Sequence, residues 1–180
     1  MRHALTSAIL LAAALAGLAA CDDFQTRSPA AADEKPAAAV SRAFRHEITG
    51  DLSGYYIPAT EVAIGKYRLT HLFLGQGADF SQWEGGGKSE TFGPVMFEFA
   101  DESGATVRVL PKAYLVEDGR VRFAGSSPEL GEVSFEGALD QGALATARRN
   151  LGEEAPVLSG TLRAGGQSFP GQKFRWYGGD

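Results

Sequence analysis

The segment KAYLVEDGRVRFAG (residues 112–125) restricts the fold most, because an Asp-Gly pair separates two stretches of alternating polarity. Asp118-Gly119 is typical of a two-residue type I′ turn, in which both central residues take positive φ. A turn at this position places four apolar side chains on one face of a hairpin: Tyr114, Val116, Val121 and Phe123. The turn and the polarity pattern agree on one register, so a half-buried β-hairpin is predicted here.

A second hairpin is predicted within residues 95–110 (VMFEFADESGATVRVL). A three-residue loop over residues 102–104 places its final glycine, Gly104, at the left-handed position of a bulge turn. This loop pairs Phe99 with Val107 and keeps the charged side chains on the opposite face. The register therefore satisfies both faces of the hairpin.

A third hairpin is predicted over Gly165-Gly166, within the segment LSGTLRAGGQSF (residues 158–169). It pairs Leu162 with Phe169. Pro170-Gly171 should then interrupt the strand, because proline lacks the backbone donor of a sheet ladder.

Two other segments have a different pattern. The segment KYRLTHLFLG (residues 66–75) reads as a strand buried on both faces, with His71 in phase with Leu69 and Phe73. In DQGALATARRNLG (residues 140–152), apolar residues instead recur at helical spacing: Leu144, Ala147 and Leu151. With Asp140 as N-cap and Gly152 at C′, this pattern predicts one short helix near 140–151.

Glycine makes up 23 of the 180 residues, which indicates many tight turns between short strands. Seven to nine antiparallel strands and one helix predict a mainly β fold. An antiparallel β-sandwich and a partly closed β-barrel both satisfy the pattern. Residues 43–180 are long enough to form this structure as a single domain.

Residues 1–20 begin with a positive charge at Arg2 and continue as an uncharged run of Leu, Ile and Ala. A positive start, an apolar stretch and small residues before a break are typical of a secretory signal peptide. The run is at the short limit for a membrane-spanning helix of roughly 17–25 residues. A retained transmembrane anchor is therefore the alternative.

The end of this run, Leu18-Ala19-Ala20-Cys21, is similar to the lipobox of bacterial lipoproteins. The resemblance covers these N-terminal residues only. It implies that cleavage occurs before Cys21, that Cys21 is lipidated, and that the mature chain is anchored to a membrane of the bacterial envelope, facing the periplasm. Several acyl chains anchor a protein stably, whereas one does so only marginally. Asp22 resembles a signal for retention in the inner membrane; the outer membrane is the alternative.

Residues 21–42 follow as a stretch rich in Ala, Pro, Ser and charge, and we interpret them as the lipidated cysteine and a flexible tether. Pro29 and Pro36 argue against an Ala-rich helix in this stretch. Cys21 is the chain's one cysteine, so no internal disulfide can form. Removal of residues 1–20 leaves 16 Lys and Arg against 22 Asp and Glu, a net charge of −6. This balance argues against nucleic acid or anionic lipid as partner.

Motifs that carry chemistry are not found in residues 43–180. In EGGGKSE (residues 84–90), the glycine that a P-loop needs six residues before Lys88 is replaced by Gln82, so no nucleotide site is predicted. His46 and His71 lack further ligands at metal-binding spacing. No serine occupies a G-x-S-x-G elbow. We therefore predict no metal, cofactor or catalytic residue, while an enzyme of another kind stays open.

Aromatic residues are the remaining candidates for function. Tyr55 and Tyr56 form an apolar cluster beside Gly54, and Phe80 and Trp83 fall in what the sequence indicates is a mobile, Gly-rich loop. Aromatic side chains on loops can be the contact residues for a partner. The alternative is that they close one end of the sheet structure as a lid over the core.

The sequence thus predicts a membrane-anchored envelope lipoprotein with a non-enzymatic binding or structural domain. Its expected partner is an envelope protein, a cell-wall component or a lipid. The main alternative is a small β-barrel that carries an apolar ligand such as a lipid, which requires a cavity of roughly 300 Å³ or more. A hydrolase is the third interpretation, and it requires polar groups that converge on a pocket.

Overall fold

The computed structural model describes residues 43–179, so the predictions for the signal peptide, Cys21, Asp22 and the tether lie outside the described residues. The described part is mainly β, with two short helices. In chain order its elements are β1 Phe44–Glu47, β2 Gly54–Pro58, β3 Ala63–Ile64, β4 Tyr67–Leu74, α2 Gly77–Glu84, β5 Val95–Ala100, β6 Thr106–Val109, β7 Pro111–Glu117, β8 Arg120–Ser127, β9 Gly131–Leu139, α3 Gln141–Arg149, β10 Pro156–Ala164 and β11 Gln167–Tyr177.

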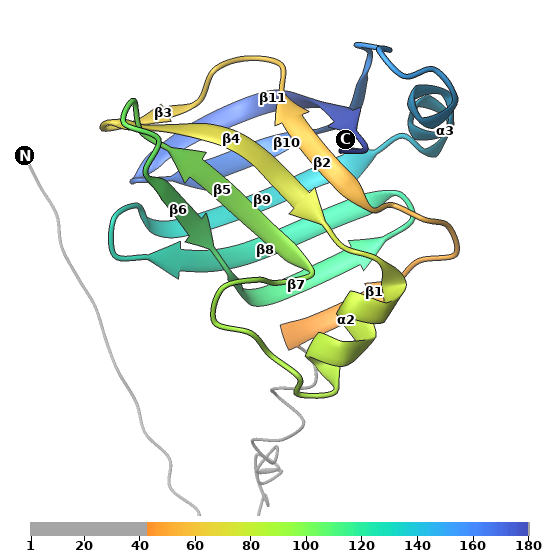
Figure 1. Ribbon diagram of the computed structural model, residues 1–180, viewed down its shortest axis with the longest axis horizontal. Coiled ribbons are helices and arrows are strands. Elements are labelled where there is room, and N and C mark those ends of the chain that lie inside the picture. The colour runs from red at the N-terminus through yellow and green to blue at the C-terminus, as the bar shows by residue number, and fades with distance from the viewer. Residues whose placement is uncertain (1–42, 180) are drawn as a thin grey trace, which may run out of the picture. The chain divides into compact units, whose positions relative to one another are not determined.

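All eleven strands of the described residues belong to one sheet, with the order β1-β7-β8-β9-β10-β11-β2-β4-β5-β6 and β3 paired with β4. The sheet curls into a half-barrel, so that β2, β4, β5 and β6 lie in front of β7 to β10 (Figure 1). The predicted mainly β fold with a partly closed barrel is therefore confirmed. The sheet is mixed rather than purely antiparallel, because β1 pairs with β7 in parallel.

The predicted hairpin registers are confirmed. Tyr114 pairs with Phe123, Phe99 with Val107, and Leu162 with Phe169. Gly104 has the predicted positive φ, at 83°. The turn type at Asp118-Gly119 was wrong, because Gly119 is not among the glycines with positive φ. The two positive φ values of a type I′ turn occur instead at Gly165 and Gly166, at 58° and 74°.

Bulges modify several predicted strands, and two of them change an expectation. Pro170-Gly171 does not end β11, because the ladder continues with a register shift of one residue, and Gly171 takes a φ of 68°. In β4 a second shift falls between Leu69 and His71. It places Leu69 in the core while His71 is half-buried, so the predicted shared phase of these two residues was wrong.

The core lies inside the curl and forms one continuous cluster of buried apolar side chains. Phe97 of β5 contacts Phe123 of β8 and Phe135 of β9 across the half-barrel, with ring centroids 5.1 and 5.9 Å apart. Phe135 in turn contacts Phe174 of β11 at 5.5 Å. The front and back walls therefore pack against each other as the two layers of a sandwich do.

Helix α3 begins at the predicted N-cap, where the Asp140 carboxylate accepts a hydrogen bond from the backbone N–H of Ala143 at 2.9 Å. Leu144 and Ala147 are buried as predicted. Leu151 is 86% exposed, because the helix ends at Arg149 and the chain turns away before the third apolar position.

Helix α2 occupies the segment that the sequence indicated as a loop, so that prediction was wrong. Its first turn is stabilised by Asp79, whose carboxylate accepts from the backbone N–H of Gln76 at 2.8 Å. Phe80 packs edge-on against Tyr114 of β7 at 5.5 Å, and Trp83 against Phe44 of β1 at 6.2 Å. α2 thus covers the side of the half-barrel next to β1 (Figure 1). Within residues 43–179, no helix has the length and apolar character needed to cross a membrane.

Candidate functional site

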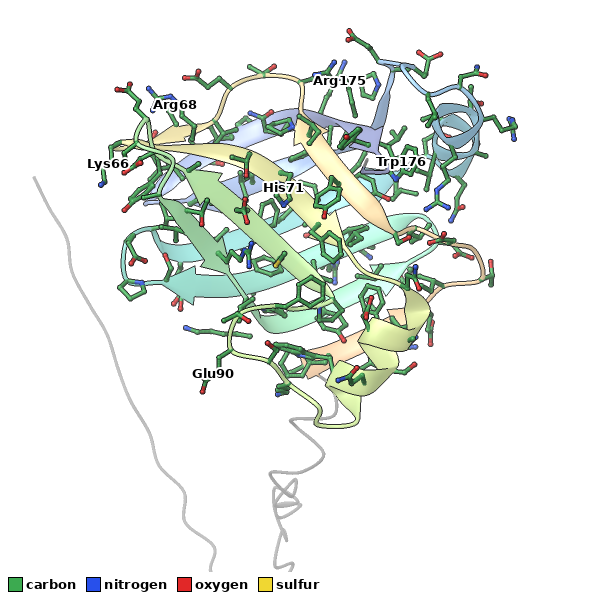
Figure 2. All side chains as sticks on the ribbon, in the orientation of Figure 1. Lys66, Arg68, His71, Glu90, Arg175 and Trp176 are labelled. Atoms are coloured by element: carbon green, nitrogen blue, oxygen red, sulfur yellow. The ribbon has the colours of Figure 1, made fainter. Side chains whose placement is uncertain are left out.

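Aromatic side chains gather on the outer face of β11, β2 and β4, and we call this group the aromatic surface: Tyr55, His71, Phe73, Phe92 and Tyr177. Tyr55 lies at its centre, with its ring centroid 4.9 Å from that of His71 and 5.3 Å from that of Phe73. Phe92 and Tyr177 are 39% and 44% exposed, which is unusual for large apolar side chains in this domain. Figure 2 shows His71 near the middle of this face.

The sheet register produces this surface. Tyr177 of β11 pairs with Tyr55 of β2, and Tyr55 pairs with Phe73 of β4, so three aromatic rings stand side by side on three adjacent strands. Phe92, in the loop before β5, packs against Phe73, with the two ring centroids 5.1 Å apart. Tyr56, one residue from Tyr55, points to the opposite face and into the core.

A pocket of about 580 Å³ adjoins the aromatic surface, and we call it the Trp176 pocket. Segments from five parts of the fold line it: the start of β2, the end of β4, the first turn of α2, α3, and the end of β11. Tyr55 and Phe73 belong both to this pocket and to the aromatic surface. Its volume is within the range of roughly 300–1,000 Å³ that is usual for small-molecule sites.

One backbone carbonyl organises the pocket. The carbonyl oxygen of Ser53 accepts a hydrogen bond from Nε1 of Trp176 at 3.0 Å and another from Nη2 of Arg148 at 2.7 Å. The Arg148 guanidinium also lies over the Trp176 indole, 5.0 Å from the ring. Figure 2 shows Trp176 beside α3, the helix that carries Arg148. These contacts fix the indole as one wall of the pocket.

Arg148 is neutralised at the pocket by Asp51, since its Nη1 donates to Oδ2 of Asp51 at 2.7 Å. The hydrogen bond from Arg148 is the largest cause that lowers the pKa of Asp51, to about 2. Asp79, from the first turn of α2, adds a carboxylate to the lining. The pocket therefore combines aromatic walls with one arginine whose charge is already paired and one carboxylate in the lining.

A second pocket of about 580 Å³ lies between the end of β9 and the start of β10. It has no aromatic wall, and the carboxylate of Asp140 in its lining already caps α3. The Trp176 pocket is the stronger candidate because its aromatic rings are continuous with exposed apolar surface.

The four residues predicted as partner contacts do not form one surface. Tyr55 lies on the aromatic surface, whereas Tyr56 and Phe80 are 0% exposed and Trp83 is 6% exposed. The Tyr56 hydroxyl donates to the carbonyl of Leu52 at 2.7 Å, and burial raises the pKa of this hydroxyl well above its ordinary value. Tyr56, Phe80 and Trp83 offer a partner little or no surface, so their burial favours the interpretation as a lid over the core.

His46 belongs to a small polar cluster between β1, α2 and β7. Its Nδ1 lies 3.0 Å from both carboxylate oxygens of Glu84, and the Tyr114 hydroxyl donates to the same carboxylate at 3.1 Å. Burial, with the adjacent Glu84 charge, raises the pKa of Tyr114 above its ordinary value. Glu84 is not among the residues that line either 580 Å³ pocket. The cluster is best explained as an attachment of β1 and α2 to the sheet.

His71 lies elsewhere, half-buried on β4 within the aromatic surface. Its Nδ1 is 3.2 Å from the Thr70 hydroxyl, and burial lowers its pKa below the ordinary value of 6.5. The two histidines thus have separate neighbours. Among residues 43–179, no group of three or more His, Cys, Asp or Glu side chains could hold a metal ion.

Sequence reasoning did not single out Arg148, Trp176 or Asp79 as site residues. Arg148 fell in the predicted helix and Asp79 next to the predicted loop residue Phe80, but no local pattern showed that they meet Trp176. A weak signal existed at Gly54 and Gly178, where missing side chains leave room for the Trp176 ring. Comparisons of the chain with protein-family models, with curated proteins and with solved structures found no match.

Proposed function

We propose that this chain is a lipid-anchored protein of the bacterial cell envelope whose β domain binds a partner without performing chemistry. The observation that carries the proposal is the aromatic surface, where partly exposed rings from three adjacent strands adjoin a pocket. Contiguous exposed apolar groups next to polar ones are typical of interaction sites, and tyrosine is a frequent contact residue.

The proposed location follows from residues 18–21, whose similarity to a lipobox favours lipidation of Cys21. A protein held at the membrane meets its partner at high effective concentration, so that even a weak contact is populated. The partner is then a component of the envelope: another protein, the cell wall or a lipid. Asp22 favours the inner membrane, with the outer membrane as the alternative.

The binding face can be tested with a photocrosslinking residue in the living envelope. We would place p-benzoylphenylalanine at position 92, 177 or 151 of the full-length protein, expressed in its native host. Phe92 and Tyr177 lie on the aromatic surface, and Leu151 is a matched control because it is an exposed apolar residue on the segment after α3. Adducts at 92 and 177 but not at 151 support the proposal. Equal yields at all three positions, or no adduct at any, overturn it.

The anchor is tested separately with Cys21→Ser. Loss of the thiol should prevent lipidation and cleavage, so that the unprocessed precursor accumulates and the processed, membrane-bound form disappears. A fully processed variant that still sediments with membranes would show that Cys21 is not the anchor. Intact mass of the wild-type N-terminal peptide provides the direct measurement.

The alternative, a carrier of an apolar ligand, needs room inside the curl. The inward rings of Phe97, Phe123 and Phe135 contact one another there. No observation on the described residues favours that alternative over the binding surface.

A further inference from the structure

We infer that the Trp176 pocket binds an uncharged saccharide, with one sugar ring stacked on the Trp176 indole. The inference rests on the proposed function, since it assigns the partner to a glycan. It depends on three properties of the pocket: its aromatic walls, its balanced polar groups and its glycine-lined floor.

The walls supply flat apolar surface from different directions. Trp176 comes from β11, Tyr55 from β2 and Phe73 from β4, and all three line the same pocket. A pyranose ring has one face made of C–H groups, and this face packs well on the electron-rich face of an aromatic ring. The Arg148 guanidinium lies over one face of the Trp176 indole, 5.0 Å from the ring, so the sugar stacks on the opposite face and keeps its own edge free.

The polar groups in the lining match the edge of a sugar. The Asp79 carboxylate accepts one hydrogen bond, from the Gln76 backbone at 2.8 Å, and an ionised carboxylate has capacity for more. Arg148 donates to Asp51 and Ser53 and has five N–H donors in all. A hydroxyl both donates and accepts, so it can satisfy both kinds of group at once.

Charge argues against the other ligand classes. An anionic ligand would find Arg148 already paired with Asp51 at 2.7 Å, with Asp79 nearby in the lining. A wholly apolar ligand would cover the remaining acceptor capacity of Asp79 and the remaining donors of Arg148, and an unpaired buried polar group costs more free energy than a typical hydrogen bond contributes. An uncharged, hydroxyl-rich ligand avoids both penalties.

The floor is built from glycines that pack closely against the side chains of the pocket. Gly54, Gly75 and Gly178 line the pocket, and a Cβ at each would lie 2.8 Å or less from Trp176 or Asp79. A side chain at any of these positions would displace the indole or the Asp79 carboxylate.

The test uses the two indole N–H signals of the protein in a ¹⁵N–¹H titration, assigned with Trp176→Phe and Trp83→Phe. The probes are a β-1,4-linked N-acetylglucosamine tetramer, a maltotetraose and an uncharged tripeptide containing tryptophan, each up to about 10 mM. We expect saturable movement of the Trp176 signal with at least one oligosaccharide. Trp83 lies in α2 against Phe44, so its signal should stay fixed and serve as the control.

Trp176→Ala should weaken saccharide binding by at least about tenfold, because it removes the stacking wall. If this variant does not fold, Asp79→Asn carries the test, since the amide keeps the oxygen that accepts from Gln76 and loses the second acceptor. We expect at least about fivefold weaker binding for Asp79→Asn. Binding unchanged in the variant that folds overturns the inference.

No movement of the Trp176 signal with either oligosaccharide overturns the inference, as does movement with the tripeptide alone. Crosslinks at positions 92 and 177 together with no saccharide binding would leave the proposed binding function standing and remove only the glycan. If protein from the native host carries no lipid at Cys21 but binds a saccharide, the pocket assignment stands and only the anchor is removed.

Discussion

Gly54 and Trp176 lie so close that a Cβ on residue 54 would overlap Nε1 of the indole and stand 3.0 Å from its Cε2. The φ of Gly54 is 140°, which also disfavours any other residue. Gly54→Ala should therefore destabilise the domain by about 1–3 kcal/mol and displace the indole. Urea denaturation measures the first effect and the Trp176 indole N–H signal the second.

Gly104→Ala is the control for the effect of backbone strain. Gly104 has a φ of 83°, and a Cβ there would meet nothing within 4 Å. A loss of stability as large as that of Gly54→Ala would show that strain, and not the contact with Trp176, limits residue 54.

Because Asp51 is paired with Arg148, we expect its carboxylate to contribute to the loss of folding stability in acid. The pKa of Asp51 is lowered to about 2 in the folded protein, against an ordinary value of 3.8. A lowered carboxyl pKa stabilises the fold above pH 3.8, and the contribution is lost as the pH falls through 3.8 towards 2. The Asp51 side chain is 56% exposed, so solvent screening keeps the effect below about 1 kcal/mol.

We expect Asp51→Asn to lose less unfolding free energy than the wild type between pH 5 and pH 2, as measured by urea denaturation. The exposed Glu129→Gln controls for removal of one negative charge. Identical pH slopes for Asp51→Asn and the wild type would contradict the contribution assigned to the Arg148 hydrogen bond.

The burial of His71 predicts that the free energy of unfolding depends on pH near neutrality. Burial lowers its pKa below 6.5, so the unfolded chain takes up a proton at a higher pH than the folded domain does. Stability is then fully present above pH 6.5 and falls as the pH drops from 6.5 towards the folded pKa. His71→Phe should flatten the dependence of unfolding free energy on pH between 7 and 5. A variant that keeps the wild-type slope would show that other groups cause it.

The complete burial of Phe80 indicates that α2 is part of the core rather than a mobile cover. Its side chain is 0% exposed and contacts Tyr114 and His46. Phe80→Ala should cost about 3–5 kcal/mol, because the truncation leaves a cavity between α2 and the sheet. Leu151→Ala, at an 86% exposed position, should change stability by no more than about 0.5 kcal/mol. Similar midpoints for the two variants in urea would refute the packing role of α2.

Local turn chemistry explains which parts of the fold were predictable. The registers at Gly104 and Gly165-Gly166 follow from turn residues and alternating polarity within about fifteen residues of chain. The parallel pairing of β1 with β7 was not predictable, because it joins Phe44 to Tyr114 with no local signal between them. α2 was missed since its glycine-rich flanks indicate a loop, while its stability comes from burying Phe80 and Trp83.

The candidate site was less predictable than the fold, because its residues are far apart in the sequence and no local pattern connects them. Trp176 donates a hydrogen bond to the carbonyl of Ser53, 123 positions away in the sequence, and Arg148 donates to Asp51, 97 positions away. Only the closure of β11 onto β2 brings these residues together. Tyr55 was found because it is an aromatic residue beside a glycine, whereas the burial of its neighbour Tyr56 follows from the two-residue period of the strand.

The edge position of β1 has a mechanical consequence. This four-residue strand is the first in the described domain, and its ladder is with β7 alone. If the chain is held at its N-terminal end, any tension between membrane and partner reaches β1 before the rest of the sheet. The load then passes to β7 through this ladder and to α2 through the contact of His46 with Glu84. We therefore expect the attachment of β1, and not the large core behind it, to yield first under such a load.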